Sequence, residues 1–464
     1  MLDPISLSPP GHAHFVGIGG AGMRALAEYL SDYGWRLSGS DLDVNTPGAR
    51  ALAARGVAVS TGHRREHVAE GTNLVIHSAA VPADNPERIE ARERGLPDLS
   101  YVDVLGILCR QRETIGIAGT HGKSTTTALC SWILESAGAD PGYLCGAELA
   151  KVQRGGRAGS GRHLVVECCE FRRHFLEVPV RSAAILSVEP DHFDCYATLD
   201  ETVDAFASFA GNLPADGLLL WNAECANTAR AVAGATCRCV SFAIDGPADW
   251  RAARVRANGP GIEFDVVHHG TTVTHVRLPL PGRHNAMNAL TAAALCLKHG
   301  IDPEAVAEGL ASFPGLRRRF ELMGHWRGAV LVDDYAHHPT EIRAALQAAR
   351  DAFPGGRLRC VFQPHQRQRT EMLMEEFAVA LASADQVFVV PVFSARESDD
   401  QANVTLSREL VSLTGVRGGR SEFGTSLDRI AATLETDVRE GDVLITLGAG
   451  DIYRLHDRFD RRIL

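Results

Sequence analysis

The sequence lacks the features that would mark a membrane-spanning, secreted or nucleic-acid-binding protein. It contains no run of about 18 uninterrupted apolar residues, so we expect no membrane-spanning helix. Residues 1–11 contain proline and serine and lack a basic region followed by an apolar one, so we expect no secretory signal. Acidic residues outnumber basic ones, and the formal net charge is -10. We therefore expect no binding of nucleic acid through bulk electrostatic attraction.

Cysteine spacing excludes two further kinds of site. The chain has 11 cysteines, an odd number, without the regular spacing of a disulfide framework. Neither Cys168 with Cys169 nor Cys237 with Cys239 has the two-residue gap and the second pair that a tetrahedral zinc site uses. We therefore expect free thiols, no zinc bound by these cysteines, and a reducing, cytoplasmic location.

Length and pattern predict an α/β protein of several domains. Single cores stop growing at about 250–300 residues, so a chain of 464 residues should form two to four domains. The hydrophobic content of 45% is that of an ordinary globular protein with apolar cores. Predicted strands and helices alternate, which is typical of mainly parallel sheets. We expect three α/β domains, at residues 1–110, 111–312 and 313–464.

The segment 115–127 has the pattern of a phosphate-binding loop. It reads I-G-I-A-G-T-H-G-K-S-T-T-T, an apolar strand followed by a small-residue loop and the start of a helix. In such a loop the backbone N–H groups bind phosphate oxygens, Lys123 reaches the β- and γ-phosphates, and the Ser124 hydroxyl lies beside Mg²⁺. Gly119 and Gly122 enclose two residues instead of the usual four. The alternative is a glycine-rich turn that merely precedes Lys-Ser.

A second glycine-rich turn occurs near the amino end of the chain. Residues 17–23 read G-I-G-G-A-G-M between a predicted strand and a predicted helix, and Asp41 ends the next strand. The glycines and this acid have the spacing of a dinucleotide-binding fingerprint. The alternative is a strand-to-helix turn that binds no ligand. A later strand, 73–78, ends in a small-residue loop, where open α/β sheets bind ligands.

Acidic residues and a histidine follow two predicted strands of the central region. The strand 163–166 is followed by E-C-C-E at 167–170, and the strand 183–188 is followed by E-P-D-H at 189–192. Two apolar strands that deliver acids or a histidine at their carboxyl ends are what a phosphate-loop enzyme needs to hold its metal. We interpret the glycine- and arginine-rich segment 151–162 as a loop.

The last 150 or so residues repeat the alternation of strands and helices. Strands are predicted at 329–332, 359–362, 386–390 and 442–447, with helical segments between them. This order predicts a third α/β domain with a mainly parallel sheet.

The order of these motifs resembles that of the Mur ligase family over nearly the whole chain, and within it the alanine-adding branch. Each motif alone is weak, but the ordered set is highly specific. The motifs are G-I-G-G-A-G-M at 17–23, S-G-S-D at 38–41, G-T-H-G-K-S-T at 119–125, E-P-D-H-F-D at 189–194, L-P-G-R-H-N at 280–285, R-R-R-F-E at 317–321, D-D-Y-A-H-H-P-T-E at 333–341 and F-Q-P-H at 362–365.

The resemblance implies an ATP-dependent ligase that joins an amino acid to a carboxylate through an acyl phosphate. For the alanine-adding branch, the substrates are UDP-N-acetylmuramate and L-alanine, and the cofactors are ATP and two Mg²⁺ ions. The implied fold has a Rossmann-like domain for the UDP part of the substrate, a central phosphate-loop ATPase-type domain, and a Rossmann-like C-terminal domain that closes over ATP. We expect a monomer or a homodimer.

The resemblance also implies a role for individual residues of this chain. The catalytic set is Lys123, Glu170, His192, His337 and His338. The ATP-binding set is Gly119, Thr120, His121, Gly122, Lys123, Ser124, Thr125, His284, Asn285, Asn288, Arg319 and Asp334. The residues for the UDP substrate are Gly19, Gly20, Ala21, Gly22, Asp41, Ser78 and Arg369. The metal ligands are Ser124, Glu170 and His192, with Glu170 shared by both ions.

The sequence departs from the family pattern at several positions. Cys169 replaces an acid that many relatives have, although Glu170 is retained. Ser187 stands where the family pattern has asparagine, and Gln366 stands where arginine is frequent, which leaves Arg369 as the better candidate for a substrate contact. Some sister ligases have a carbamylated lysine in the neighbourhood of residues 205–208, where this chain has A-F-A-S. Its absence fits the alanine-adding branch.

Three other functions compete with this interpretation. The nearest is the recycling ligase of the same family, which attaches a whole peptide to the same sugar acid; G-G-A-G-M at 19–23 favours the alanine-adding enzyme. A nicotinamide-dependent oxidoreductase would use the first glycine-rich turn and Asp41, but it leaves Lys123 and Glu170 without a role. A regulatory module would bind ATP without turnover, and Glu170 with His192 argues against it.

Overall fold

The computed structural model describes residues 7–394 and 400–462, and these fold into two compact units. Unit 1 consists of residues 7–189, 200–251 and 288–310. Unit 2 consists of residues 190–199, 252–287 and the described residues from 311 onward. Within the described part of the chain, no helix is long and apolar enough to cross a membrane.

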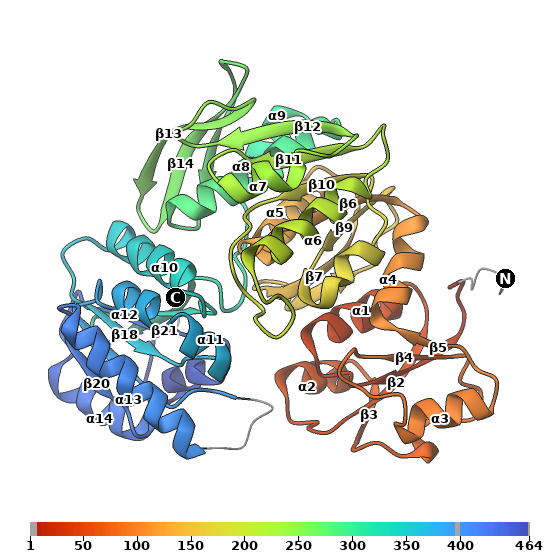
Figure 1. Cartoon of the computed structure of the whole chain (residues 1–464), viewed down its shortest axis with the longest axis horizontal. Helices are drawn as coiled ribbons and strands as arrows, with labels where there is room; N and C mark the ends of the chain where they lie inside the picture. The colour runs from red at the N-terminus through yellow and green to blue at the C-terminus, as the bar shows by residue number, and fades with distance from the viewer. Residues whose placement is uncertain (1–6, 395–399, 463–464) are drawn as a thin grey trace. The chain divides into compact units, whose positions relative to one another are not determined.

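The first sheet of unit 1 is open and parallel, with the strand order β3-β2-β1-β4-β5 (Figure 1). Its central strand, β1, is buried along its whole length, as expected for a parallel sheet. The strand predicted at 73–78 is confirmed as β4. The elements are β1 (His12–Val16), α1 (Ala21–Asp32), β2 (Arg36–Asp41), α2 (Pro47–Ala54), β3 (Ala58–Thr61), β4 (Leu74–His77), α3 (Pro86–Glu93), β5 (Asp98–Ser100) and α4 (Tyr101–Arg110).

A fully buried carboxylate, Glu87, connects α3 to strands β1 and β2 and to the segment that follows β3. It accepts hydrogen bonds from the Ser40 hydroxyl at 2.5 Å and from the Arg64 amide at 3.2 Å. His67 Nδ1 lies 2.7 Å from Glu87 Oε1, and His14 Nε2 lies 3.5 Å from Glu87 Oε2. Burial alone would raise the pKa of Glu87, but hydrogen bonds with His14, Ser40 and His67 outweigh it and lower the pKa to about 2.

The second sheet of unit 1 contains the phosphate-loop segment. Its strands follow the order β12-β11-β10-β6-β9-β7-β8, and adjacent strands are parallel except β7 with β8. The central strand β6 lies between β9 and β10, so the loop that follows β6 is flanked by the carboxyl ends of both. The elements are β6 (Glu113–Ala118), α5 (Lys123–Ser136), β7 (Gly142–Leu149), β8 (Arg154–Arg157), β9 (His163–Glu167), β10 (Ser182–Ile185), α6 (Leu199–Gly211), β11 (Leu218–Asn222), α7 (Ala226–Val232) and β12 (Arg238–Ala243).

The prediction of a loop over residues 151–162 is wrong in part, because β8 lies within this segment. The amides of Gly155 and Gly156 donate hydrogen bonds to Glu28 of α1 at 2.8 and 3.0 Å. A side chain at Gly156 would collide with the α1 backbone at Ala25. Glycine therefore permits close packing of α1 on this strand, although its presence in the sequence indicates a loop.

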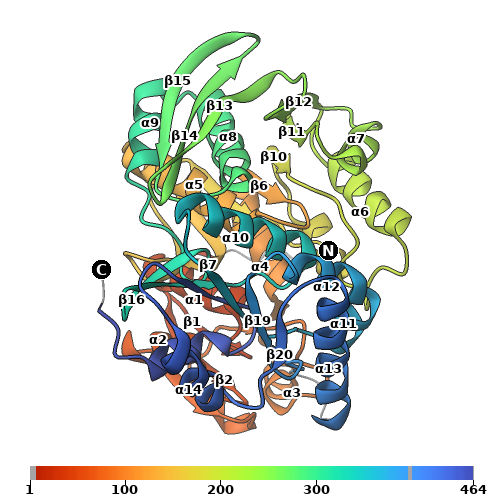
Figure 2. The ribbon, with the colours of Figure 1, turned by 90° about the vertical axis from the view of Figure 1, so that its left-hand side faces the viewer.

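A β-hairpin lies between the central and C-terminal regions, where we predicted no strands. The strand β13 (Trp250–Asn258) begins in unit 1, where its first two residues pair with β12. In unit 2, β14 (Gly261–His268) and β15 (Thr271–Leu278) form an antiparallel pair, which Figure 2 shows as two long neighbouring strands. The hairpin is followed by α8 (Arg283–Lys298) and α9 (Pro303–Ala311).

The C-terminal sheet of unit 2 has the strand order β16-β17-β21-β18-β19-β20, and only β16 is antiparallel to its neighbour. Alternate residues enter separate apolar clusters, with Val332 and Cys360 in one and Leu331 and Val361 in the other. Burial on both faces explains the apolar runs from which the strands were predicted.

The predicted strands of this region are confirmed as β17, β18, β19 and β21. The elements of the C-terminal sheet and its helices are β16 (Glu321–Trp326), β17 (Ala329–Asp334), α10 (Pro339–Ala352), β18 (Leu358–Phe362), α11 (Arg367–Met372), α12 (Met374–Leu381), β19 (Gln386–Val389), α13 (Asp400–Val416), β20 (Ser421–Phe423), α14 (Leu427–Asp437) and β21 (Val443–Leu447).

The buried Glu87 makes a testable contribution to stability. Its native pKa lies below the ordinary value of 4.5, so its stabilisation is present above about pH 4.5 and is lost as the pH falls toward 2. Glu87→Gln should lower the free energy of unfolding at pH 7 by on the order of 2–3 kcal/mol. Urea unfolding at pH 7, 4.5 and 3 should show a weaker acid dependence in the variant. Glu93→Gln, on the same helix, is the control; parallel pH profiles for native protein and Glu87→Gln would contradict the assignment.

Candidate active site

The phosphate-loop segment has the backbone geometry that its sequence predicts. Gly119 has φ +134°, and a Cβ there would lie 2.9 Å from the Leu186 backbone nitrogen. Gly122 has φ +80° and is the N-cap residue directly before α5. Both conformations favour glycine, because a side chain at these positive φ values is strained. The loop therefore leads directly to a helix N-terminus, where backbone N–H groups are free to bind an anion.

Lys123, the first residue of α5, is held in the loop by hydrogen bonds and an ion pair. Its Nζ donates to the Gly119 carbonyl at 2.5 Å and to the Thr120 carbonyl at 3.1 Å. Glu170, which is almost fully buried, places Oε2 2.8 Å from Nζ. Burial alone would lower the pKa of Lys123, but the Glu170 carboxylate outweighs it and raises the pKa above its ordinary value. Lys123 is thus a permanent cation at the loop.

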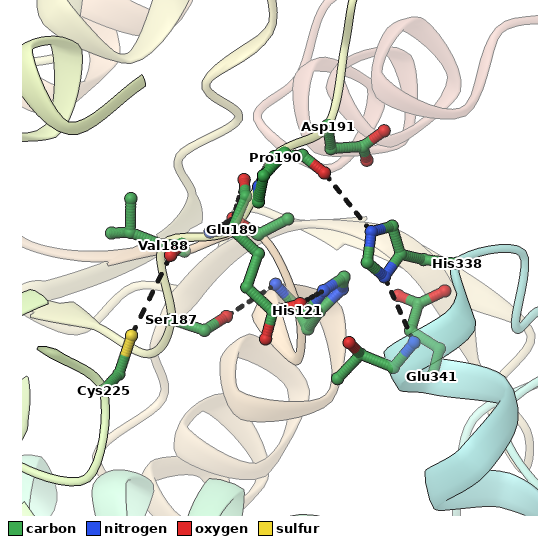
Figure 3. Close-up of polar contacts among 12 residues, drawn as sticks. His121, Ser187, Val188, Glu189, Pro190, Asp191, Cys225, His338 and Glu341 are labelled. Atoms are coloured by element: carbon green, nitrogen blue, oxygen red, sulfur yellow. Dashed lines mark hydrogen bonds and ion pairs between the residues drawn. The ribbon is translucent and has the colours of Figure 1, made fainter. Parts of the chain in front are cut away.

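The strand end beside the loop anchors it through Ser187 and Glu189. The His121 amide donates to the Ser187 hydroxyl at 3.0 Å, as Figure 3 shows, and the Thr120 amide donates to the Ser187 carbonyl at 2.9 Å. The Glu189 amide donates to the Thr120 hydroxyl at 2.9 Å. Ser187, a departure from the family pattern, therefore fixes two successive residues of the loop.

Two asparagines of α8 were predicted to recognise adenine. In unit 1, Asn288 Oδ1 accepts a hydrogen bond from the Thr126 hydroxyl of α5 at 3.3 Å. A Cβ on Gly122 would collide with this same oxygen, so Asn288 lies against the phosphate loop. In unit 2, the Asn285 side-chain amide donates to the Pro281 carbonyl at 2.7 Å. The Asn285 side chain, in the first turn of α8, thus holds the turn that precedes this helix.

The first glycine-rich turn, in unit 1, is in contact with Asp41 and Ser78, two residues that were predicted to bind the same substrate. The Gly19 amide donates to Asp41 Oδ2 at 2.8 Å, and a Cβ on Gly17 would lie 3.2 Å from the Ser78 side chain. Gly20, just before α1, has its nearest neighbouring atom 3.9 Å from a virtual Cβ. The turn therefore gathers Asp41 and Ser78 at the carboxyl ends of β1, β2 and β4, and at Gly20 it leaves enough room for a Cβ to make only an ordinary van der Waals contact.

Unit 2 contains a buried ion pair beside His192. Arg369 places Nη2 2.7 Å from Asp191 Oδ1, and its Nε donates to the same oxygen at 2.8 Å. Burial alone would raise the pKa of Asp191, but the Arg369 guanidinium outweighs it and holds the pKa well below its usual range. His192 has φ +52°, and its amide donates to Asp191 Oδ1 at 2.8 Å. This strained backbone is thus fixed by the ion pair.

Arg319 lies just before β16, and Asp334 is the last residue of β17 in the C-terminal sheet. Asp334 accepts hydrogen bonds from the amides of Phe320 and Ala336, each at 2.7 Å. Burial raises the pKa of Asp334 to about 6, although nearby Arg319 opposes this shift. The Arg319 guanidinium lies over the Tyr335 ring, 5.0 Å from its centroid. Both side chains are therefore positioned by local contacts within unit 2.

His337 and His338 differ in the use of their ring nitrogens. His337 Nδ1 lies 2.9 Å from the Tyr335 carbonyl, so Nδ1 carries the proton and Nε2 keeps a lone pair. Burial lowers the pKa of His337 to about 3, despite the nearby Glu341 carboxylate. His338 Nδ1 accepts from the Thr340 amide at 3.3 Å, and Nε2 lies 3.3 Å from the Pro190 carbonyl (Figure 3). Both nitrogens of His338 are thus engaged, and this residue caps α10.

The predicted site residues are divided between the units. Unit 1 brings Lys123 together with Glu170, and Asn288 with the phosphate loop. Sequence reasoning assigned no role to Asp191 or to the Ser187 hydroxyl. The acid next to His192 in E-P-D-H was the signal for Asp191, and the unusual serine was the signal for Ser187. The predicted residues in unit 2 are His192, His284, Asn285, Arg319, Asp334, His337, His338 and Arg369.

Comparison with known proteins identifies relatives over nearly the whole length of the chain. Residues 12–113 match "Mur ligase family, catalytic domain", 117–296 match "Mur ligase middle domain", and 318–450 match "Mur ligase, glutamate ligase domain". The UDP-N-acetylmuramate–L-alanine ligase of Clostridium acetobutylicum is 36% identical over 448 residues, 96% of each chain.

Two solved structures are similar over nearly the full chain. A UDP-N-acetylmuramate–alanine ligase from Thermotoga maritima has a TM-score of 0.81 and 29% identity, covering 97% of this chain and 98% of that one. A murein peptide ligase from Psychrobacter arcticus has a TM-score of 0.69 and 24% identity, with the same coverage. The second likeness shows the fold alone. The α/β fold expected from the sequence is thus confirmed.

The anchoring of the phosphate loop by Ser187 can be tested by removing one hydroxyl. Ser187→Ala removes the hydrogen bond from the His121 amide, so we expect a loss of about 1 kcal/mol, or roughly five-fold weaker binding of MgADP. Isothermal titration calorimetry measures the affinity. Ser208→Ala, which removes an exposed hydroxyl of α6, is the matched control. Equal MgADP affinity in Ser187→Ala and the control would show that the hydroxyl does not hold the loop.

Proposed function

Because the chain belongs to the Mur ligase family, we propose that it uses ATP to join L-alanine to the carboxyl group of UDP-N-acetylmuramate. The 36% identity to a ligase of that name, over 96% of both chains, carries this assignment. The pairing of Lys123 with Glu170 at a phosphate loop supplies the matching chemistry. The product is a precursor of peptidoglycan.

The reaction needs activation, because the oxide of a free carboxylate is a very poor leaving group. The muramate carboxylate attacks the γ-phosphorus of ATP, which forms an acyl phosphate and releases ADP. The free amine of alanine then attacks the acyl carbon, a tetrahedral intermediate forms, and phosphate leaves as the amide is made. Both steps accumulate negative charge, so catalysis depends on fixed cations and on positioning.

Lys123 is the cation that this chain supplies for the phosphoryl transfer. Its ammonium group is held at the loop by the Gly119 and Thr120 carbonyls, so its positive charge lies where the β- and γ-phosphates bind. Its raised pKa keeps it charged at any working pH. The backbone N–H groups at the start of α5 add hydrogen bonds to the phosphates.

Ser124 and Glu170 fit the Mg²⁺ of the nucleotide. A hydroxyl and a carboxylate are hard oxygen ligands of the kind that Mg²⁺ prefers. The Glu170 carboxylate already contacts one cation, the Lys123 ammonium, at 2.8 Å. When bound, Mg²⁺ neutralises phosphate charge. We assign His192 to a second ion shared with Glu170, and the fixed backbone of His192 beside Asp191 supports a positioned side chain.

The remaining contacts to ATP come from α8 and from the C-terminal region. Asn285 and Asn288, with His284, recognise adenine, while Arg319 and Asp334 reach the phosphates and ribose. Asp334 suits a ribose contact, because its carboxylate is already fixed by two amides. We assign closure over ATP to the C-terminal domain, residues 313–464. The other two proposed domains are residues 1–110 and 111–312.

His337 rather than His338 handles the amine of alanine. Its Nε2 keeps a lone pair, whereas both nitrogens of His338 are engaged in hydrogen bonds. The pKa of His337, about 3, makes it a weak base at neutral pH. His337 therefore orients the amine as a hydrogen-bond acceptor, and the proton passes to solvent.

The first glycine-rich turn binds the UDP part of the sugar substrate. Gly20, at the N-terminus of α1, lacks a side chain and is not crowded by other residues, which suits close approach of the pyrophosphate. Asp41 and Ser78 lie at the same sheet edge. We assign Arg369 to the sugar substrate as well, with Asp191 holding its guanidinium. The free cysteines support a reducing, cytoplasmic location, and a monomer or homodimer stays our prediction.

Substrate dependence tests the proposed function directly. ADP release, measured with a coupled assay, should require both UDP-N-acetylmuramate and L-alanine, and mass spectrometry should show the amide product. A tripeptide, the kind of acceptor that the recycling ligase attaches, should give little turnover when it is offered in place of alanine. Faster turnover with the tripeptide would identify the recycling ligase instead. ADP release that needs neither acceptor nor sugar acid would exclude both ligases.

The role of Lys123 generates a quantitative prediction. Lys123→Ala should lower kcat by about 100-fold or more, because the transferring phosphoryl group loses a fixed cation. Lys151→Ala, at an exposed lysine, should keep native turnover and serves as the control. Steady-state kinetics at saturating substrates, with circular dichroism to verify folding, measure the effect. Near-native turnover in a folded Lys123→Ala protein would remove the phosphate-loop assignment.

A further inference from the structure

Two histidines and a glutamate meet at the amino edge of the central sheet, far from the phosphate loop. Glu113 begins β6 and His163 begins β9, and these two residues are paired in the parallel ladder. His299 directly follows α8. The phosphate loop follows the other end of β6, about 17 Å away for a strand of this length. The cluster therefore lies outside the site described above.

The side chains of this cluster converge on one point. One ligand atom from each of Glu113, His163 and His299 lies within 4.8 Å of the other two. His163 Nε2 lies 3.8 Å from Glu113 Oε2, and the two imidazole rings meet edge to face with centroids 5.0 Å apart. His299 Nε2 lies 3.0 Å from the Ser182 hydroxyl, which fixes the orientation of its ring. A histidine ligand held by a second hydrogen bond is usual at metal sites.

The His163 ring is buried without a hydrogen-bond partner. Its side chain is only 3% exposed, and neither ring nitrogen has a hydrogen-bond partner in the structure. Leaving a buried polar group without a hydrogen bond destabilises the fold. Burial lowers the pKa of His163, and burial together with His163 lowers the pKa of His299 to about 4. Both rings are therefore neutral at pH 7, the form that coordinates metals.

We propose that Glu113, His163 and His299 bind a divalent transition-metal ion of the Zn²⁺ type, with water as a fourth ligand. Two imidazole nitrogens select such an ion over Mg²⁺, which prefers oxygen. Bond lengths of about 2.1 Å place tetrahedral ligand atoms about 3.4 Å apart. The separation of 3.8 Å is near this value, and the Glu113 side chain, 42% exposed, has room to rotate inward.

Arg162 is the charged group that competes with a metal for this cluster. Its Nε lies 3.7 Å from Glu113 Oε2, and its Nη2 donates to the His299 carbonyl at 3.2 Å. The Arg162 side chain is 62% exposed, so its contact with Glu113 is weak and it can turn toward solvent. A bound dication would then replace it as the partner of the carboxylate.

A metal here would join three segments that are distant in the sequence. β6 leads to the phosphate loop, β9 leads to Glu170, and α8 contains Asn288. A ligand that binds only the folded chain stabilises it in proportion to its affinity and concentration. The site is therefore structural, and occupancy should raise the midpoint of thermal unfolding without supplying a reacting group.

Direct binding of Zn²⁺ and Co²⁺ to the full chain tests the proposal. The reduced protein, in a millimolar excess of Mg²⁺, should bind one Zn²⁺ in competition with a chromophoric chelator and should unfold at a higher temperature. Co²⁺ should give the visible absorption of a tetrahedral nitrogen–oxygen site. His163→Gln should bind Zn²⁺ at least about 100-fold more weakly and should lose the thermal shift. His174→Gln, a half-buried histidine of the same unit, should behave as native.

Unchanged Zn²⁺ affinity and thermal shift in His163→Gln would overturn the proposal. Thiolate-to-cobalt charge transfer that persists in this variant would also overturn it, because the metal would then lie on cysteines. Should His163→Gln fail to fold, anomalous diffraction at the zinc edge from crystals of the native protein decides the question. A peak bounded by His163 and His299 supports the site, and zinc located only elsewhere excludes it.

Discussion

The ion pair between Lys123 and Glu170 is the interaction on which the candidate site depends. Each charge would be costly to bury alone, because desolvation is repaid only when a partner is close and further hydrogen bonds are made. Two carbonyls of the phosphate loop complete the shell of Lys123. The pair therefore requires that β6 and β9 be neighbours, since one leads to the loop and the other to Glu170. The strand order of the sheet therefore determines whether the two charges of the site can pair.

Much of this arrangement could be predicted because it is local in sequence. Gly122 and Lys123 follow directly from the chemistry of a loop before a helix, and the structure gives Gly122 the expected positive φ. The strands of the C-terminal sheet were predicted because both of their faces are buried, which makes them apolar throughout. Such signals need no knowledge of what lies next to the segment in space.

The parts that could not be predicted depend on neighbours distant in the sequence. Ser187 anchors the loop only because β10 lies beside β6, and Asp191 acquires its partner from Arg369, 178 positions away. Gly155 and Gly156 read as loop residues, but their lack of side chains lets α1 approach β8. In each case the role of the residue depends on packing against an element that the local sequence pattern does not reveal.

The buried pairing of Lys123 has a practical consequence for chemical labelling. The chain has only three lysines, at positions 123, 151 and 298. Acylating reagents attack the neutral amine, and the raised pKa of Lys123 keeps its amine protonated. Lys298 lies against the Trp250 ring, whereas Lys151 is exposed on the surface. Amine chemistry at moderate pH thus offers a route to attach a dye or a solid support at the other amines of the chain, with Lys123 left unmodified.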